Sequence, residues 1–267
     1  MNRINYLKLV IATIPLTVAA FTPVVRAEGQ PNPIPTVAEN QWRGSVTPYM
    51  WLMNVSGAVA RNGDTLGSVH LDTNSLLSNL NVAAMIEGEV HRGNWGLWGD
   101  LVYSQLSNQS SRLSVGQTTL NTTTTLTTGI YDIAATYTLH ASPGAYVDGL
   151  VGARILTQDT TVNLSTVGLL PNGVNRNSST TITNAIVGVK GRVQISDSTW
   201  FVPFYLDVGA GSAQTNVTSQ AMLGIGKAYS WGDVSLAVKN VYYQLSQNKQ
   251  TADLNIFGAA LAVTFRF

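Results

Sequence analysis

The chain has 267 residues, of which 45% are hydrophobic and only 11% are charged, whereas about 25% of the residues are charged in an ordinary soluble domain. Disordered chains are rich in charge and poor in apolar residues, so this composition excludes disorder. The absence of cysteine excludes a disulfide scaffold and a Cys-ligated metal centre. A formal net charge of +1 gives no sign of nucleic-acid binding.

The first 27 residues have the three parts of a secretory signal peptide. Arg3 and Lys8 supply the positive start, residues 9–21 are mostly apolar, and Val25 and Ala27 are small residues at the −3 and −1 positions. A transmembrane helix is the alternative, but the apolar run is shorter than the roughly 18 residues that a helical span needs. The sequence therefore predicts cleavage after Ala27.

Residues 28–41 contain three prolines and are predicted to form an extended periplasmic lead-in. From Trp42 to Phe267 the apolar residues recur with a period of two, as where Val187, Val189 and Val193 alternate with Lys190 and Arg192. Such alternation predicts half-buried β-strands. We expect ten of them, at about 44–56, 80–91, 95–107, 124–140, 145–157, 181–196, 200–211, 218–231, 234–245 and 253–267.

The connections between these strands alternate between short and long. Four are tight turns, at 92–94, 141–144, 197–199 and 232–233, and the longer polar links between them are 57–79, 108–123, 158–180, 212–217 and 246–252. This layout is typical of outer-membrane barrels, whose short turns are periplasmic. The predicted fold is an all-β, closed antiparallel transmembrane barrel (residues 42–267) of about ten strands, with eight as the alternative. An even number places both termini on the periplasmic side.

Two of the long links contain further patterns. Leu76, Leu77 and Leu80 have helical spacing, so residues 72–80 are predicted to form a short amphipathic helix that plugs the mouth or, as we prefer, packs on the rim. The threonine-rich run from Thr118 to Thr128 has high β-propensity, which favours strand that continues beyond the bilayer over a low-complexity linker.

Aromatic residues gather at the predicted strand ends. Rings beside short turns are expected to form the periplasmic aromatic girdle, and a second set the outer one. In a soluble sandwich, the alternative, aromatic residues would fill the core from strand centres. The periplasmic set is Trp42, Trp95, Tyr146, Trp200 and Trp231, and the outer set is Tyr103, Tyr131, Tyr242 and Phe257.

The last strand ends in Thr264-Phe265-Arg266-Phe267, and residues 49–52 (YMWL) and 95–103 (WGLWGDLVY) have the look of early barrel strands. In these features the chain resembles bacterial outer-membrane β-barrel proteins, in particular small barrels of uncertain function. The resemblance implies an outer-membrane location in contact with lipid and lipopolysaccharide. It also implies that Phe265 and Phe267 are an assembly signal, read by the barrel-assembly machinery after periplasmic chaperones deliver the chain.

Most of the charge falls on positions that the alternation places inside the barrel. Ionised groups facing lipid are costly, so inward is where they are expected. The similar numbers of acids and bases favour a paired ion network over a charge-selective pore, and about eight strands leave an interior just filled by side chains. The expected network consists of Glu87, Glu89, Asp100, Asp132, Asp148, Arg154, Lys190, Arg192, Asp207, Lys239 and Arg266.

Motifs of hydrolases, zinc proteases and phosphate-binding loops are absent from the sequence. Of the three histidines, His91 and His140 are at predicted periplasmic strand ends, and His70 lies in the first long link with Asp64 and Asp72. No positioned nucleophile accompanies His70. The sequence therefore predicts a non-enzymatic structural or surface barrel, or a narrow pore for small solutes, without cofactor or metal. An outer-membrane hydrolase with its site in the outer loops is the alternative.

Overall fold

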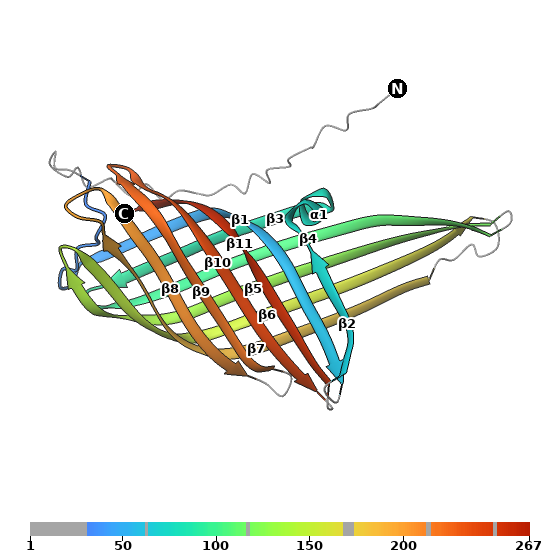
Figure 1. Cartoon of the computed structure of the whole chain (residues 1–267). Coiled ribbons are helices and arrows are strands. Elements are labelled where there is room, and N and C mark those ends of the chain that lie inside the picture. The colour runs from blue at the N-terminus through green and yellow to red at the C-terminus, as the bar shows by residue number, and fades with distance from the viewer. Residues whose placement is uncertain (1–30, 62–63, 116–117, 168–173, 212–214, 248–249) are drawn as a thin grey trace, which may run out of the picture.

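The computed structural model describes residues 31–61, 64–115, 118–167, 174–211, 215–247 and 250–267. The signal peptide and its cleavage site at Ala27 therefore lie outside the described residues. Within them the chain forms one short helix and eleven strands (Figure 1). The elements are β1 (Trp42–Arg61), β2 (Asp64–Leu71), α1 (Thr73–Ser78), β3 (Leu80–Arg92), β4 (Trp95–Val115), β5 (Thr118–Ser142), β6 (Ala145–Val167), β7 (Val174–Gln194), β8 (Trp200–Gly211), β9 (Thr215–Tyr229), β10 (Gly232–Gln247) and β11 (Gln250–Arg266).

Ten of these strands form a closed antiparallel ring, as the sequence predicts. Each strand from β3 to β11 pairs with its neighbour in sequence, and β1 closes the ring by pairing with both β3 and β11. The eleventh strand, β2, pairs with the far half of β1 outside the ring. Closure leaves no free sheet edge in the ring, which is the condition for strands to survive in lipid.

The turns are tight at one end of the barrel, which we call the turn end and which is the predicted periplasmic side. The opposite end is the loop end. Three turns lie where the sequence predicts them, but the fourth consists of Ser230 and Trp231 because Gly232 and Asp233 already belong to β10. At the first turn Gly93 adopts φ +59°, a left-handed conformation that glycine accepts without steric cost.

The strands are longer at the loop end than the sequence analysis predicts. Most residues of the links 108–123 and 158–180 extend β4 to β7, which reach furthest in Figure 1. Treating them as loops was wrong, because their Thr and Ser residues are polar yet pair well as strands above a bilayer. The predicted strand extension from Thr118 is confirmed. The predicted helix is shorter than expected and has no buried residues.

Large apolar side chains cover the outside of the ring. Leu139, Val151 and Leu206, on three different strands, are each more than half exposed. Contiguous exposed apolar surface of this kind marks contact with membrane or protein. At the turn end Trp42, Trp95, Trp200 and Trp231 are exposed as a girdle requires, but placing Tyr146 there was wrong, since its ring lies inside the barrel. Among the described residues no helix is long and apolar enough to cross a membrane.

The segment before β1 lies at the turn end of the lumen. Pro33 and Ile34 are buried, and the backbone carbonyls of Asn32 and Pro33 accept hydrogen bonds from Arg266 (2.8 Å) and Arg192 (3.1 Å). The extended lead-in is thus held by the inward-facing Arg192 and Arg266 at the turn end of the barrel.

Candidate functional site

The inward-facing side chains form layers that follow one another along the lumen. This arrangement arises because the strands alternate, so that every second residue faces inward and successive inward residues lie one level further along. Near mid-barrel lies what we call the central ion layer, formed by Asp100, Asp132, Arg154, Asp207 and Lys239.

Arg154 is the centre of this layer, and its side chain is completely buried. From β6 it donates to both carboxylate oxygens of Asp132 on β5, each at 2.9 Å, and to Asp207 on β8 at 2.6 and 3.0 Å. It also donates to Gln220 on β9 at 3.0 Å. A guanidinium has five donors and no acceptor, so these partners satisfy it without water. The Arg154 side chain thereby links β6 to β5, β8 and β9 through hydrogen bonds.

The second pair of the layer crosses the lumen. Lys239 on β10 lies 2.6 Å from Asp100 on β4, and Tyr49 on β1 bridges them. The Tyr49 hydroxyl donates to Asp100 at 2.7 Å and accepts from Lys239 at 3.1 Å. β4 and β10 are on opposite sides of the ring. The contact between Lys239 and Asp100 therefore closes the part of the lumen that the Arg154 cluster does not fill.

A second group of charges lies nearer the turn end. Lys190 on β7 bonds to Glu89 and lies 3.8 Å from Glu87, both on β3. The Lys190 ammonium is also 5.6 Å from the centre of the Trp98 ring, within the range of a cation–π contact. This group is less buried than the central ion layer, since the Glu87 side chain is 31% exposed.

Arg192 and Arg266 both pair with Asp233 at 2.9 Å, close to the lead-in segment. Asp233 is buried, and the sequence analysis missed it because its neighbour Gly232 favoured a turn at this position. Its place at the first inward position of β10 follows once the turn is moved to residues 230–231.

Among the described residues Asp148 forms no ion pair with Lys or Arg, and its carboxylate faces His91 instead. His91 Nε2 lies 3.7 Å from Asp148 and 3.7 Å from Glu89, and Thr138 donates to Asp148 at 2.9 Å. The other imidazole nitrogen lies 3.1 Å from the guanidinium of Arg43. Gly96 makes room for this ring, because a Cβ there would lie 2.5 Å from it.

Donor atoms of Glu89, His91 and Asp148 all lie within 4.8 Å of one another, a spacing that a metal ion could use. A metal-bound histidine, however, normally donates its second N–H to an acceptor, and here that nitrogen faces Arg43, which has none to offer. Lys190 already neutralises Glu89. We therefore interpret this group as part of the ion network and not as a metal centre.

All eleven predicted network residues thus fall into these clusters, and the sequence analysis missed three members. These are Asp233, His91 and Arg43, whose guanidinium also donates to Gly93 O and the Tyr146 hydroxyl, both at 2.6 Å. Extending the alternation of β1 back from Trp51 would have placed Arg43 inside.

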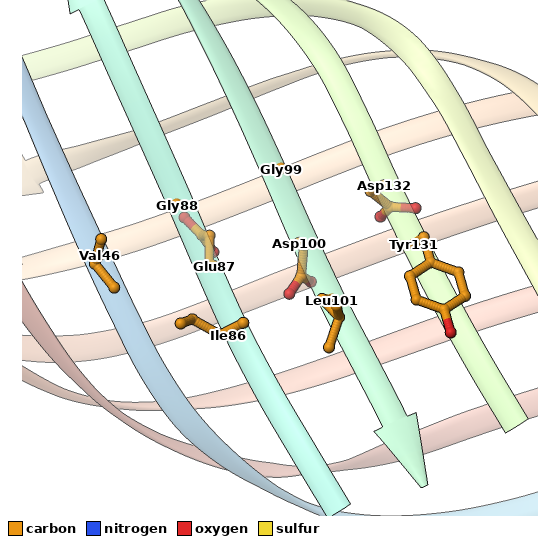
Figure 2. A pocket seen from close by; sticks show the side chains of 9 residues that line it. All are labelled: Val46, Ile86, Glu87, Gly88, Gly99, Asp100, Leu101, Tyr131 and Asp132. Atoms are coloured by element: carbon orange, nitrogen blue, oxygen red, sulfur yellow. The ribbon is translucent and has the colours of Figure 1, made fainter. Parts of the chain in front are cut away.

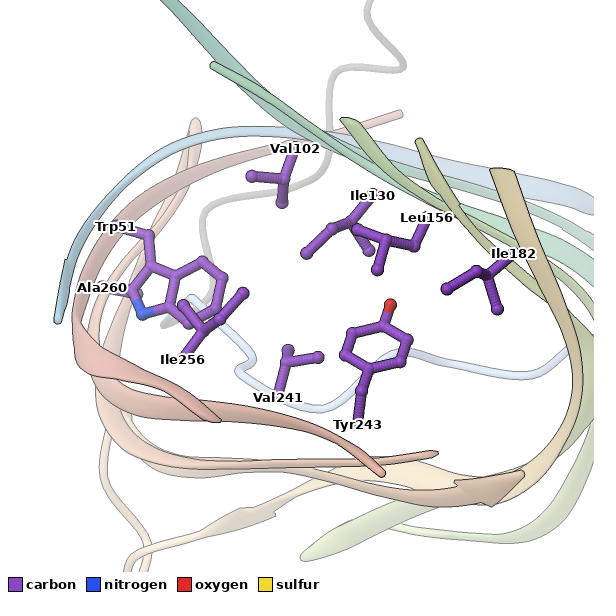
Figure 3. Packing of buried hydrophobic residues seen from close by; sticks show 9 residues of the cluster. All are labelled: Trp51, Val102, Ile130, Leu156, Ile182, Val241, Tyr243, Ile256 and Ala260. Atoms are coloured by element: carbon purple, nitrogen blue, oxygen red, sulfur yellow. The ribbon is translucent and has the colours of Figure 1, made fainter. Parts of the chain in front are cut away.

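Toward the loop end, the lumen lining changes from charged to apolar. Figure 3 shows the side chains of this part, which point from all sides toward the middle of the lumen. They lie about one inward position beyond the central ion layer: Leu156 follows Arg154, and Ile130 precedes Asp132 on the neighbouring antiparallel strand. We call them the apolar cluster: Trp51, Val102, Ile130, Leu156, Ile182, Val241, Tyr243, Ile256 and Ala260.

The structure does not assemble the predicted outer His/Asp group into a recognisable site. His70 is exposed on β2, and the side chain of Asp64 lies outside what the structure describes. Asp72 caps helix α1, where it accepts from the Ser75 N–H at 2.7 Å, and this bond lowers the pKa of the carboxyl. Asp72 therefore has a local structural role.

Comparison with known proteins finds no matching family model and no matching curated protein. Among solved structures, the outer membrane protease OmpT from Escherichia coli is similar, with a TM-score of 0.50 and 10% identity over 87% of this chain and 99% of that one. The chain is a β-barrel of the outer-membrane type. At this identity the likeness concerns the fold alone.

Other similar structures score lower. The translocator domain of the autotransporter NalP from Neisseria meningitidis has a TM-score of 0.44 with 12% identity, covering 87% of this chain and 89% of that one. Ail, the attachment invasion locus protein of Yersinia pestis, has a TM-score of 0.33 with 10% identity, covering 86% and 100%.

Proposed function

We propose that this barrel is a non-enzymatic outer-membrane protein that acts as a structural or surface barrel with a closed lumen. The observation that carries this proposal is the central ion layer. Arg154, Asp132 and Asp207 are at most 5% exposed, and Lys239 reaches Asp100 from the other side of the ring. Ions and small solutes would have to break these contacts to pass.

Two further features support closure. The ion groups around Lys190 and Asp233 lie between the central layer and the turn end. The buried Pro33 and Ile34 then lie at the turn end itself. Because these barriers are stacked, removal of one leaves the others in place.

Liposome swelling with small neutral sugars tests this proposal in the refolded mature protein. We expect no swelling above protein-free liposomes, both for the intact protein and for a variant lacking residues 28–36, because the central ion layer remains. Swelling of the intact protein would contradict the closed lumen and establish the narrow pore for small solutes. Swelling only after the deletion would show that the lead-in segment is the barrier.

The hydrolase alternative receives no support from the outer histidine, since Asp72 is engaged as a helix cap. The likeness to OmpT at 10% identity concerns the fold alone and carries no activity. A hydrolytic activity of the purified barrel that disappears in His70→Ala would establish it against our proposal.

We also propose that Phe265 and Phe267 form the signal for the barrel-assembly machinery, with periplasmic chaperones, lipid and lipopolysaccharide as further partners. The Phe267 backbone exchanges two hydrogen bonds with Gly44, at 2.8 and 3.0 Å, where β11 closes the ring on β1. Deleting Phe267 should lower the amount of folded, heat-modifiable protein in cells, whereas Phe257→Ala, in the middle of the same strand, should not. Equal amounts in both would contradict the assignment.

A further inference from the structure

The ladder between β1 and β3 is incomplete. The two strands pair from Trp42–Arg92 to Pro48–Ile86, and β2 takes over as the partner of β1 only from Val55. Within the described residues, the six positions 49–54 of β1 thus have no ladder partner on this side, although β3 continues to Leu80. We call this part of the wall, between residues 49–54 and 80–85, the seam.

Side chains replace the missing ladder at the seam. The backbone N–H of Trp51 donates to the thioether sulfur of Met85 at 3.1 Å, and the Met53 carbonyl accepts from the Thr73 hydroxyl at 3.1 Å. Met85 therefore lies between the two strands and fills the opening. Methionine is flexible, and its sulfur is only a weak acceptor, so this closure costs little to open.

The seam lies at the level of the exposed apolar side chains on the outside of the ring, which we call the apolar belt. Its β1 residues pair on their other side with β11 from Ala262 to Phe257, and Phe257 and Leu261 are both exposed apolar residues of the belt. Met50 on the seam is itself 52% exposed. Unpaired backbone in hydrocarbon is costly and is tolerated only where it is covered by protein or lines a cavity. At the seam this cover is supplied by the side chains of Met85 and Thr73.

Both sides of the seam are apolar. On the inside, Trp51 belongs to the apolar cluster, and Met53 and Met85 pack against it. On the outside, a groove of about 370 Å³ runs across β1, β3, β4 and β5, beside the part of the seam nearest the turn end (Figure 2). It exists because the paired Gly88 and Gly99 have no side chains there. Val46, Ile86, Leu101 and Tyr131 line it, together with Glu87, Asp100 and Asp132 from the ion clusters.

We propose that the seam is a lateral opening through which a single alkyl chain passes between the bilayer and the apolar cluster of the lumen, with Met85 as the side chain that closes it. The groove at Gly88 and Gly99 holds the chain on the membrane side. The occupant is an alkyl chain because the side chains along this path are mostly apolar, and the charged central ion layer forms its floor. The chain belongs to a membrane lipid, because the groove that would hold it lies on the outer, apolar face of the wall.

The width of the seam can be measured with cysteine pairs, since the natural chain has no cysteine. Continuing the register of β1 and β3 places Met50 opposite Ala84, while Trp42 and Arg92 are a true pair of the same two strands. Disulfides need Cα atoms within about 7 Å. We expect Trp42→Cys/Arg92→Cys to oxidise directly and Met50→Cys/Ala84→Cys to close only with a longer bis-thiol-reactive linker. Equal direct oxidation would overturn the proposal.

Photolabelling tests passage of the chain in the full mature protein in liposomes. One arm uses a phosphatidylethanolamine with a diazirine in its acyl chain, and the other uses a free diazirine fatty acid added from water. Mass spectrometry locates the label. We expect label on the inward-facing Trp51 or Val102, lost when the linker closes Met50→Cys/Ala84→Cys and kept in Trp42→Cys/Arg92→Cys. Label in the first arm supports the membrane lipid as the occupant, and label in the second arm alone would overturn that assignment.

The closing side chain gives a further comparison. Met85→Ala should increase the label inside the lumen, and Met85→Leu, which keeps the volume, should not. Absence of label inside the lumen in both arms, or label that the linker leaves unchanged, would overturn the proposal. None of these readouts depends on the permeation of ions or sugars. The lateral opening and the closed lumen are therefore tested independently, and either can fail without the other.

Discussion

The two halves of the lumen are closed by different physical means. Toward the turn end, charged groups from every described ring strand except β9 are joined in buried clusters, which include the central ion layer. A smaller apolar cluster lies in the same half, formed by Trp98, Ala134, Leu150, Ile186 and Tyr205. Toward the loop end, the apolar cluster fills the space with side chains that have no directional bonds to one another. An ion pair fixes which strands face each other, whereas apolar packing tolerates rearrangement at a small cost.

The wall follows the same division. Beside the charged half, β1 pairs with β3 without interruption, and beside the apolar half this pairing ends at Pro48. The turn end is thus closed by continuous strand pairing, whereas the wall at the loop end can open at the seam. The following variants each change one half of the barrel, and the stability or permeability of the protein is then measured.

The largest effect is expected from Arg154→Met. This change leaves Asp132 and Asp207 buried without their cation, and breaking a buried pair costs about 3–5 kcal/mol. Urea unfolding of the protein in vesicles should show the loss. Arg176→Met is the matched control, because Arg176 is exposed and exposed substitutions usually change stability by less than about 0.5 kcal/mol. Equal effects of the two would mean that the central ion layer is hydrated.

A double-mutant cycle on Lys239 and Asp100 sharpens this result. Either Lys239→Met or Asp100→Leu leaves one buried charge unpaired and should destabilise the barrel strongly, by about 3–5 kcal/mol. The double variant should be less destabilised than either single variant, with about 1–3 kcal/mol remaining for the Tyr49 hydroxyl that loses its partners. Additive single effects would show that the two groups act independently.

In the apolar half a small truncation should have a small effect. Ile182→Val removes one buried methylene and should cost about 0.5–1.5 kcal/mol, with no change in permeability because the central ion layer is intact. Ile133→Val on the lipid-facing side of β5 is the control, since Ile133 is 54% exposed and leaves no internal cavity. A gain of sugar permeation in Ile182→Val alone would show that the apolar cluster, and not the ion layer, is the barrier.

The ring and the inward charges could be predicted because both depend on alternation along single strands. The inward orientation of Asp132, Arg154 and Asp207 follows from the alternation along their strands alone. Their grouping could not be predicted, since it depends on the tilt and stagger of strands across the closed ring. The error at Tyr146 has a different cause. Tyr146 has the same phase as Asp148 and Arg154 on β6, so alternation alone places it inside, but a ring beside a turn also fits the girdle pattern.

The seam has one signal in the sequence, Pro48, at which the pairing of β1 with β3 ends and which has no N–H to donate to a ladder. Residues 49–53 are all apolar and look like ordinary buried strand, and β2 lies in a link that reads as polar loop. Pairing partners are a property of the whole ring, so a missing partner becomes visible only when every strand has been placed.

Single-channel recording of the wild-type mature protein in planar bilayers tests the closed lumen most directly. Folded protein, identified by its heat-modifiable mobility, should insert without producing any steady open level, because the central ion layer spans the lumen and the pairs near the turn end lie behind it. A steady open level with ion selectivity, seen in proportion to the folded fraction, would contradict the account and identify the barrel as a charge-selective pore.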